Sequence, residues 1–131
     1  FGNLIGLYMK AGIGKLSAYC GAVSAGSAGA AAIAFLHGEE PQIIADTLTN
    51  SLAALSGVLC DGAKPSCAMK IAMSVGCGEI AYRQAREGYT FRPGDGIVKK
   101  NINETVKTIT AVARYGMKET DNVILREMLK E

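Results

Sequence analysis

The stretch GAVSAGSAGAAAIAFL, residues 21–36, contains no charged side chain and consists mostly of alanine and glycine. It is shorter than the ~20 apolar residues that a membrane-spanning helix needs, and two serines interrupt it. Each glycine in a helix costs about 1 kcal/mol relative to alanine, so glycines kept at that cost indicate close packing or the approach of a ligand. We therefore expect a central, largely buried helix.

Residues on both sides of this stretch also have helical spacing. One predicted helix lies around Leu4, and a second pattern is compatible with a helix that starts at Leu16. Two more helices are predicted at residues 41–59 and 65–86. The last two are predicted to start after an N-cap at Asn103 and after a cap at Thr120 or Asp121. No segment alternates as a sheet strand would. The sequence therefore predicts an all-α fold, a compact bundle of about five or six helices without a sheet of three or more strands.

Length and charge limit the possible classes of protein. The chain has 131 residues, a formal net charge of +2 and 20% charged residues without a block of one sign. This suits one domain, residues 1–131, and argues against nucleic acid or a membrane as a partner. The chain starts at Phe1 in the middle of a helical pattern, without a recognisable signal peptide. We expect a cytoplasmic domain that is a fragment of a longer protein.

Two apparent nucleotide-binding motifs do not hold. Gly14-Lys15 resembles a phosphate loop, but Met9 stands where the first glycine is needed and Leu16 where Ser or Thr is needed. Residues 76–81 (GCGEIA) match a loose dinucleotide pattern within a predicted helix and follow no strand. His37 is the only histidine, which excludes a histidine-rich metal site on this chain, and we interpret it as structural.

The four cysteines are the strongest chemical signal. Cys60 and Cys67 bracket the loop of CDGAKPSC, where a helix start and nearby lysines favour a thiolate. Cys20 immediately precedes the Gly/Ala-rich helix. These three could hold an iron–sulfur cluster with one open iron, could be small buried core residues, or could bind a structural zinc. Cys77 is predicted to be a core residue.

Four segments carry a resemblance to a known family. They are residues 17–26 (SAYCGAVSAG), 60–70 (CDGAKPSCAMK), 94–98 (GDGIV) and 116–121 (GMKETD). In this order they resemble the C-terminal half of the L-cysteine desulfidase branch of the iron–sulfur L-serine dehydratase alpha-chain superfamily. The likeness covers essentially the whole chain, and the motif from Cys60 to Cys67 is fairly specific.

The resemblance implies a lyase. Such proteins use a [4Fe-4S] cluster and no pyridoxal phosphate to remove water or sulfide from L-serine or L-cysteine, giving pyruvate and ammonia. It assigns cluster ligation to Cys20 and Cys60, and to Cys67 if the dehydratase branch is followed. In the desulfidase branch an N-terminal cysteine is implicated instead, on a segment that this chain lacks. The isolated chain is therefore expected to be inactive and to need the N-terminal half of the same protein.

Residues within the loop are expected to support the cluster or bind the amino-acid substrate. The backbone amide of Gly62, the Ser66 hydroxyl and Lys64 are candidate donors, and Asp61 could orient Lys64 or a substrate ammonium group. The α-proton base is not identified.

A different class of function stays open alongside the lyase. The rival hypothesis is a catalytically silent helical domain that acts in assembly, and a homo-oligomer is possible. For the fragment itself, we expect Cys20, Cys60 and Cys67 to converge, with a Cys60–Cys67 disulfide possible in air.

Overall fold

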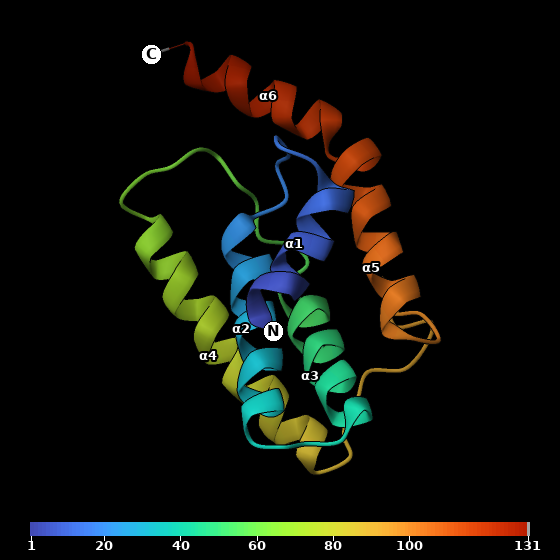
Figure 1. Cartoon of the computed structure of the whole chain (residues 1–131). Coiled ribbons are helices and arrows are strands. Elements are labelled where there is room, and N and C mark those ends of the chain that lie inside the picture. Colours follow the sequence, from blue (N-terminus) through green and yellow to red (C-terminus); the bar gives the residue numbers. More distant parts are fainter. Residues whose placement is uncertain (131) are drawn as a thin grey trace.

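A computed structural model describes residues 1–130 of the chain, and helices are the regular elements of this range, joined by loops. Figure 1 shows the helices α1 to α6, and the elements are α1 Gly2–Ile13, α2 Gly21–Leu36, α3 Pro41–Ala54, α4 Cys67–Arg86, α5 Ile102–Ala111, the π-helical turn η1 Val112–Gly116 and α6 Lys118–Met128. The only extended pairing within 1–130 is an isolated antiparallel bridge between Tyr19 and Leu59. The all-α prediction is confirmed.

Helix α2 occupies the centre of the bundle, as its composition predicts. It packs against α1, α3 and α4 (Figure 1), and seven of its sixteen residues are buried. Its C-terminal turn is more exposed than expected, since Leu36 lies largely in solvent. The helix ends at His37, whose ring stacks on Tyr82 with centroids 5.8 Å apart. This stacking agrees with the structural role predicted for the histidine.

Small residues allow α2 and α4 to approach closely. A Cβ atom built at Gly26 would lie 2.5 Å from the Cβ of Ser74 and 2.9 Å from its backbone carbon. A Cβ atom at Gly78 would lie 2.8 Å from the Cβ of Ala30. These distances are shorter than atoms tolerate, so the two helices can cross here only because glycine occupies both positions.

The main core lies between α1, α2, α3 and α5. Met9, Val23, Leu52 and Ile109, one from each helix, are almost fully buried there. Beside this core, the buried Asn50 amide donates to the carbonyl of Tyr89 and accepts from the Phe91 N–H, which fixes the loop after α4. Among residues 1–130, no helix combines the length and hydropathy needed to cross a membrane.

Helix α2 starts later than the compatible pattern from Leu16 suggested. Gly14 has a φ of +98°, which ends α1, and residues 18–20 run extended because they pair with residues 58–60. The Ser17 hydroxyl donates to the carbonyl of Ala113 at 2.8 Å, beside the π-helical turn. Tertiary hydrogen bonds therefore override helix propensity in this segment.

The bounds of four other helices also differ from those predicted. Helix α3 ends at Ala54 instead of near Leu59, since the following residues turn toward the bridge, and α4 starts at Cys67, two residues after Pro65. Helix α5 is capped by Asn101 rather than Asn103, because the Asn101 side chain accepts from the Glu104 N–H. Helix α6 starts at Lys118, before the caps expected at 120 or 121.

Candidate functional site

The bridge between residues 18–20 and 58–60 brings two of the predicted cluster cysteines together. The Cys20 N–H donates to the Val58 carbonyl at 3.3 Å, and the Cys60 N–H donates to the Ala18 carbonyl at 2.7 Å. Such diagonal neighbours are roughly 7–8 Å apart. Because side chains alternate along extended chain, both cysteines project to the side opposite Tyr19 and Leu59. The backbones of Cys20 and Cys60 thus converge as expected.

Cys67 reaches the same region from α4. It is the first residue of that helix, is half-buried, and donates its thiol hydrogen to the Gly62 carbonyl at 3.5 Å. Gly62 has a φ of +95°, which L side chains rarely adopt, so a glycine is required at this point of the loop. The turn therefore sets how far Cys67 lies from Cys60.

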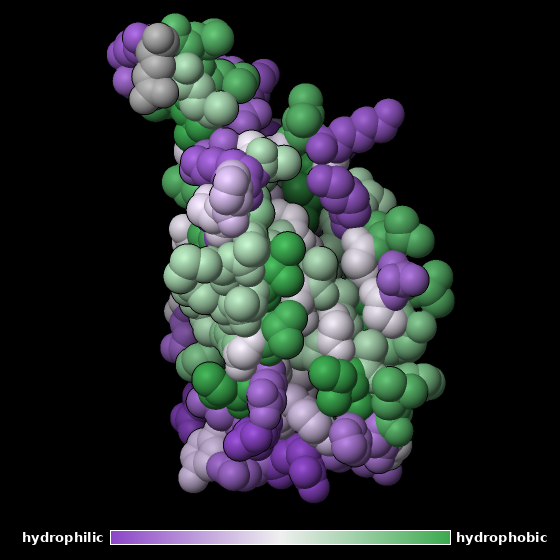
Figure 2. Space-filling model, turned by 90° about the vertical axis from the view of Figure 1, so that its left-hand side faces the viewer, coloured by the Kyte–Doolittle hydropathy of each residue, from purple (hydrophilic) through white to green (hydrophobic). Residues whose placement is uncertain are grey.

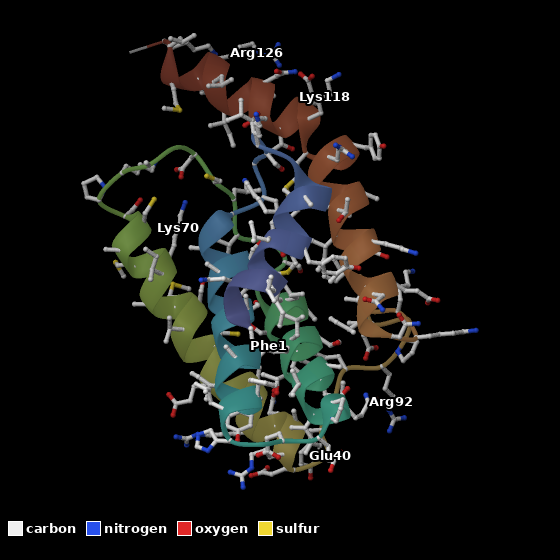
Figure 3. All side chains as sticks on the ribbon, in the orientation of Figure 1. Phe1, Glu40, Lys70, Arg92, Lys118 and Arg126 are labelled. Atoms are coloured by element: carbon white, nitrogen blue, oxygen red, sulfur yellow. The ribbon has the colours of Figure 1, made fainter. Side chains whose placement is uncertain are left out.

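Charged residues anchor the loop to α4. The Asp61 carboxylate forms ion pairs with Lys64 and with Lys70, the latter at 2.7 Å, and Lys70 also donates to the Leu59 carbonyl at 2.8 Å. Lys70 extends from α4 toward the loop that precedes the helix (Figure 3). Asp61 thus orients Lys64, one of the two roles proposed for it.

The pKa values of this group follow from the same contacts. Hydrogen bonds from Lys64 and Lys70 hold the pKa of Asp61 well below its ordinary value of 3.8. The Asp61 carboxylate raises the pKa of Lys70, and negative charge on the thiols of Cys20 and Cys67 raises it further. Lys70 therefore stays protonated, and it lies within electrostatic reach of two of the three cysteines.

Metal-ligating side chains among residues 1–130 are spread out rather than gathered at one point. Within residues 1–130, no three His, Cys, Asp or Glu side chains lie close enough together to hold one metal ion. This counts against the structural zinc alternative. The thiolates of a cluster bind different irons and stand farther apart than thiolates on one ion. The first turn of α2 carries no side-chain cap, so its first N–H groups are available to bond cluster sulfurs, whereas in α4 the N–H groups of Cys67 and Ala68 already donate to the carbonyls of Lys64 and Pro65.

The remaining predicted residues have simpler environments. Ser66 is the N-cap of α4, but its hydroxyl makes no capping hydrogen bond and can serve another partner. Cys77 lies half-buried in the middle of α4, and burial raises the pKa of its thiol. All four cysteines are free thiols, so a Cys60–Cys67 disulfide in air stays a prediction.

Two residues that the sequence did not single out flank the site. Tyr19 and Ser24 are buried, and their hydroxyls have no hydrogen-bond partner in the described part of the chain. Burial raises the pKa of Tyr19 to about 12, and charge on Cys20 adds to this shift. The sequence signal that could have identified them is their polarity, since they stand in, or just before, a helix built mostly from small apolar residues.

Replacing Asp61 with asparagine is expected to loosen residues 59–66. The low pKa of Asp61 means that its ion pairs persist as the pH falls below 3.8 and are lost only near the folded-state pKa. The asparagine variant lacks the charge at every pH. Amide hydrogen exchange at neutral pH should therefore be faster across the loop in this variant. Glu79→Gln, which removes an exposed ion pair within α4, should leave the loop unchanged. Equal exchange in both variants would contradict the anchoring role.

Comparison with known proteins agrees with the sequence pattern. The family model described as serine dehydratase alpha chain matches residues 1–126. The chain is 50% identical to a UPF0597 protein of Desulfitobacterium hafniense over 98% of its own length, and 48% identical to one of Treponema denticola over 98%. A UPF0597 protein of Bacteroides fragilis is 34% identical over 94%. The chain spans about 30% of the length of these curated relatives. No solved structure matches it significantly.

Proposed function

This chain belongs to the serine dehydratase alpha chain family, and from that membership we propose that it is the cluster-carrying part of an amino-acid lyase. The substrates we propose are L-cysteine and L-serine, from which sulfide or water is removed to give pyruvate and ammonia. Cys20, Cys60 and Cys67 hold a [4Fe-4S] cluster, and no pyridoxal phosphate takes part.

The observation that carries this proposal is the backbone pairing that brings Cys20 beside Cys60. Two backbone hydrogen bonds, from Cys20 to Val58 and from Cys60 to Ala18, hold these distant segments together. Cys67 contacts the same loop through its hydrogen bond to the Gly62 carbonyl. Two uncapped helix starts and the Lys70 ammonium provide positive potential around the three thiols. Cysteines that only filled a core would need none of these groups.

A bound cluster of this type supplies an open iron that acts as a Lewis acid on the substrate. The chain's own residues have three tasks in the proposed site. They place the positive charge of Lys70 and two helix N-termini near the thiols. They hold the loop in one conformation, which the Asp61 ion pairs do. They also exclude water on the side of Cys20, which is only 4% exposed.

The remainder of a longer protein is the partner we propose. Five apolar residues of α4 are more than half exposed: Met69, Ile71, Met73, Val75 and Ile80. Figure 2 views the molecule from the side where α4 lies in Figure 1 and shows many hydrophobic side chains on that face. Met69, Met73 and Ile80 share one side of the helix, and Ile71 and Val75 lie on the opposite side. Exposed apolar side chains on both sides of one helix favour a covering partner. We propose that the N-terminal half of the full-length protein covers these side chains and supplies further substrate-binding groups.

Anaerobic reconstitution of the full-length protein tests the function. With iron, sulfide and reduced thiols, the protein should become brown, absorb broadly in the visible range and form pyruvate from L-cysteine or L-serine. Threonine, assayed as 2-oxobutyrate, measures how narrow the substrate range is. A protein that stays colourless after reconstitution would exclude the cluster.

The same exposed face favours a second candidate function. A helical domain that serves only in assembly would also leave an apolar face on α4 for a partner or a second copy. Such a domain would form its oligomer without iron and without lyase activity. The reconstitution experiment therefore separates the two candidates, because only the lyase requires the cluster.

A further inference from the structure

A groove of about 920 Å³ lies between α1 and α2, outside the loop that holds Cys60 and Cys67. Small residues open it: Gly21 and Gly29 line the groove, and an added Cβ atom at either position would meet nothing within 4 Å. The first helical residue of α2 thus lies in the groove wall without a side chain to cover its N–H group. Tyr19 and Gly21, the neighbours of Cys20 on both sides, are part of the same wall.

Among residues 1–130, the two buried hydroxyls without a hydrogen-bond partner belong to this wall. Tyr19 is 4% exposed and Ser24 is 8% exposed, both line the groove, and neither hydroxyl has a hydrogen-bond partner within residues 1–130. Buried polar groups are nearly always hydrogen-bonded, because an unpaired one has lost its water without compensation. Two such groups on one wall therefore indicate that a polar ligand completes them.

The groove offers hydrogen-bond donors and positive charge. Lys10 is its only charged side chain, and no aspartate or glutamate lines it. The first turn of α2 has neither a side-chain cap nor an acidic residue, so its free N–H groups and the helix dipole favour an anion. The Tyr19 and Ser24 hydroxyls can each donate one hydrogen bond. This chemistry matches a carboxylate.

We propose that the end of the α1–α2 groove beside Cys20 binds the carboxylate of the amino-acid substrate, with Ser24, Tyr19 and the first turn of α2 as donors. The proposal rests on the proposed function for the identity of the ligand. It places the carboxylate beside the backbone of residues 19–21, on the side of this segment toward which Tyr19 projects.

Calorimetric titration of the iron-free, reduced full-length protein tests this site without any activity measurement. L-Serine should bind, and ethanolamine, which is serine without its carboxylate, should not. Ser24→Ala and Tyr19→Phe should each weaken L-serine binding about tenfold or more, because each removes a donor to a charged group. The matched controls are Ser27→Ala and Tyr8→Phe. Ser27 is a buried serine of α2 whose hydroxyl bonds to Ser51, and Tyr8 is a partly exposed tyrosine that bonds to Asn103.

Thermal unfolding separates binding from a structural role. Ser24→Ala and Tyr19→Phe should melt at the same temperature as the parent protein or higher, because each removes a buried hydroxyl that has no partner. Lower melting temperatures with unchanged affinity for L-serine would overturn the proposal, as would equal binding of ethanolamine or the absence of serine binding.

Failure of the proposed carboxylate site can be distinguished from failure of the proposed lyase function. A protein that loads iron and forms pyruvate, but whose KM is unchanged in both variants, would exclude the carboxylate site and leave the lyase standing. A protein that never loads iron, but binds L-serine through Ser24 and Tyr19, would exclude the lyase and leave the site standing.

Discussion

Cys20→Ser is expected to abolish cluster assembly in the full-length protein and to lower lyase activity by more than about a hundredfold, since even an outer-shell contact to a metal is worth about 10–100-fold. Cys20 is the N-cap of α2 and has an extended backbone, with φ −67° and ψ 122°. Serine is among the preferred N-cap residues, so the variant should keep its helix. The loss can then be attributed to the missing thiolate. Iron content per chain and visible absorption after anaerobic reconstitution measure it.

The other cysteines of the chain provide the comparison. Cys60→Ser and Cys67→Ser should lose iron in the same way, whereas Cys77→Ser should bind as much iron as the parent protein. Cys77 lies in the middle of α4 and near Ser51 rather than in the loop. If Cys67→Ser keeps its iron while the Cys20 and Cys60 variants lose it, the third ligand comes from another segment of the longer protein. If Cys20→Ser keeps its iron, the assignment of the cluster to this chain is wrong.

The helical fold was predictable because its signals are local. The Gly/Ala-rich composition of residues 21–36 and the helical spacing around them indicate helices whatever their neighbours are. The errors in the predicted helix bounds occur where a contact between residues distant in the sequence determines the local backbone conformation. The pairing of residues 18–20 with 58–60 delays the start of α2, and no local pattern contains it. Asn101 could have been found, because Glu104 follows it by three residues as in a capping box.

The candidate site was predictable only in part. The resemblance proposes three cysteines as cluster ligands, but their arrangement depends on the bridge and on Lys70, which lies on α4 outside the loop itself. The glycines show the same limit. Their cost predicted either close packing or the approach of a ligand. Gly26 packs closely against α4, whereas Gly21 and Gly29 line the open groove. The direction that a glycine faces is a tertiary property and does not follow from its position in a pattern.

Gly78→Ala is expected to destabilise the chain by about 1–3 kcal/mol, in spite of the better helix propensity of alanine. The new Cβ atom would lie 2.8 Å from the Cβ of Ala30 and 3.3 Å from the Gly26 carbonyl oxygen. Neither neighbour is the end of a flexible side chain, so α2 and α4 must separate to accommodate the methyl group. Gly26→Ala meets the backbone of Ser74 and should cost a similar amount. Urea unfolding followed by far-UV circular dichroism measures both changes.

Gly76→Ala is the matched control, because it lies two residues away on the same helix and an added Cβ atom there meets nothing within 4 Å. It should stabilise the chain by about 0.5–1 kcal/mol, the ordinary gain of alanine over glycine within a helix. The same substitution on the same helix should therefore raise the free energy of unfolding at position 76 and lower it at position 78. Only the crossing of α2 and α4 distinguishes the two positions. Equal stabilisation at both positions would mean that α2 and α4 do not approach as closely as Gly26 and Gly78 allow. The Cys67 end of α4 would then no longer be held against the Cys20 end of α2 by this contact.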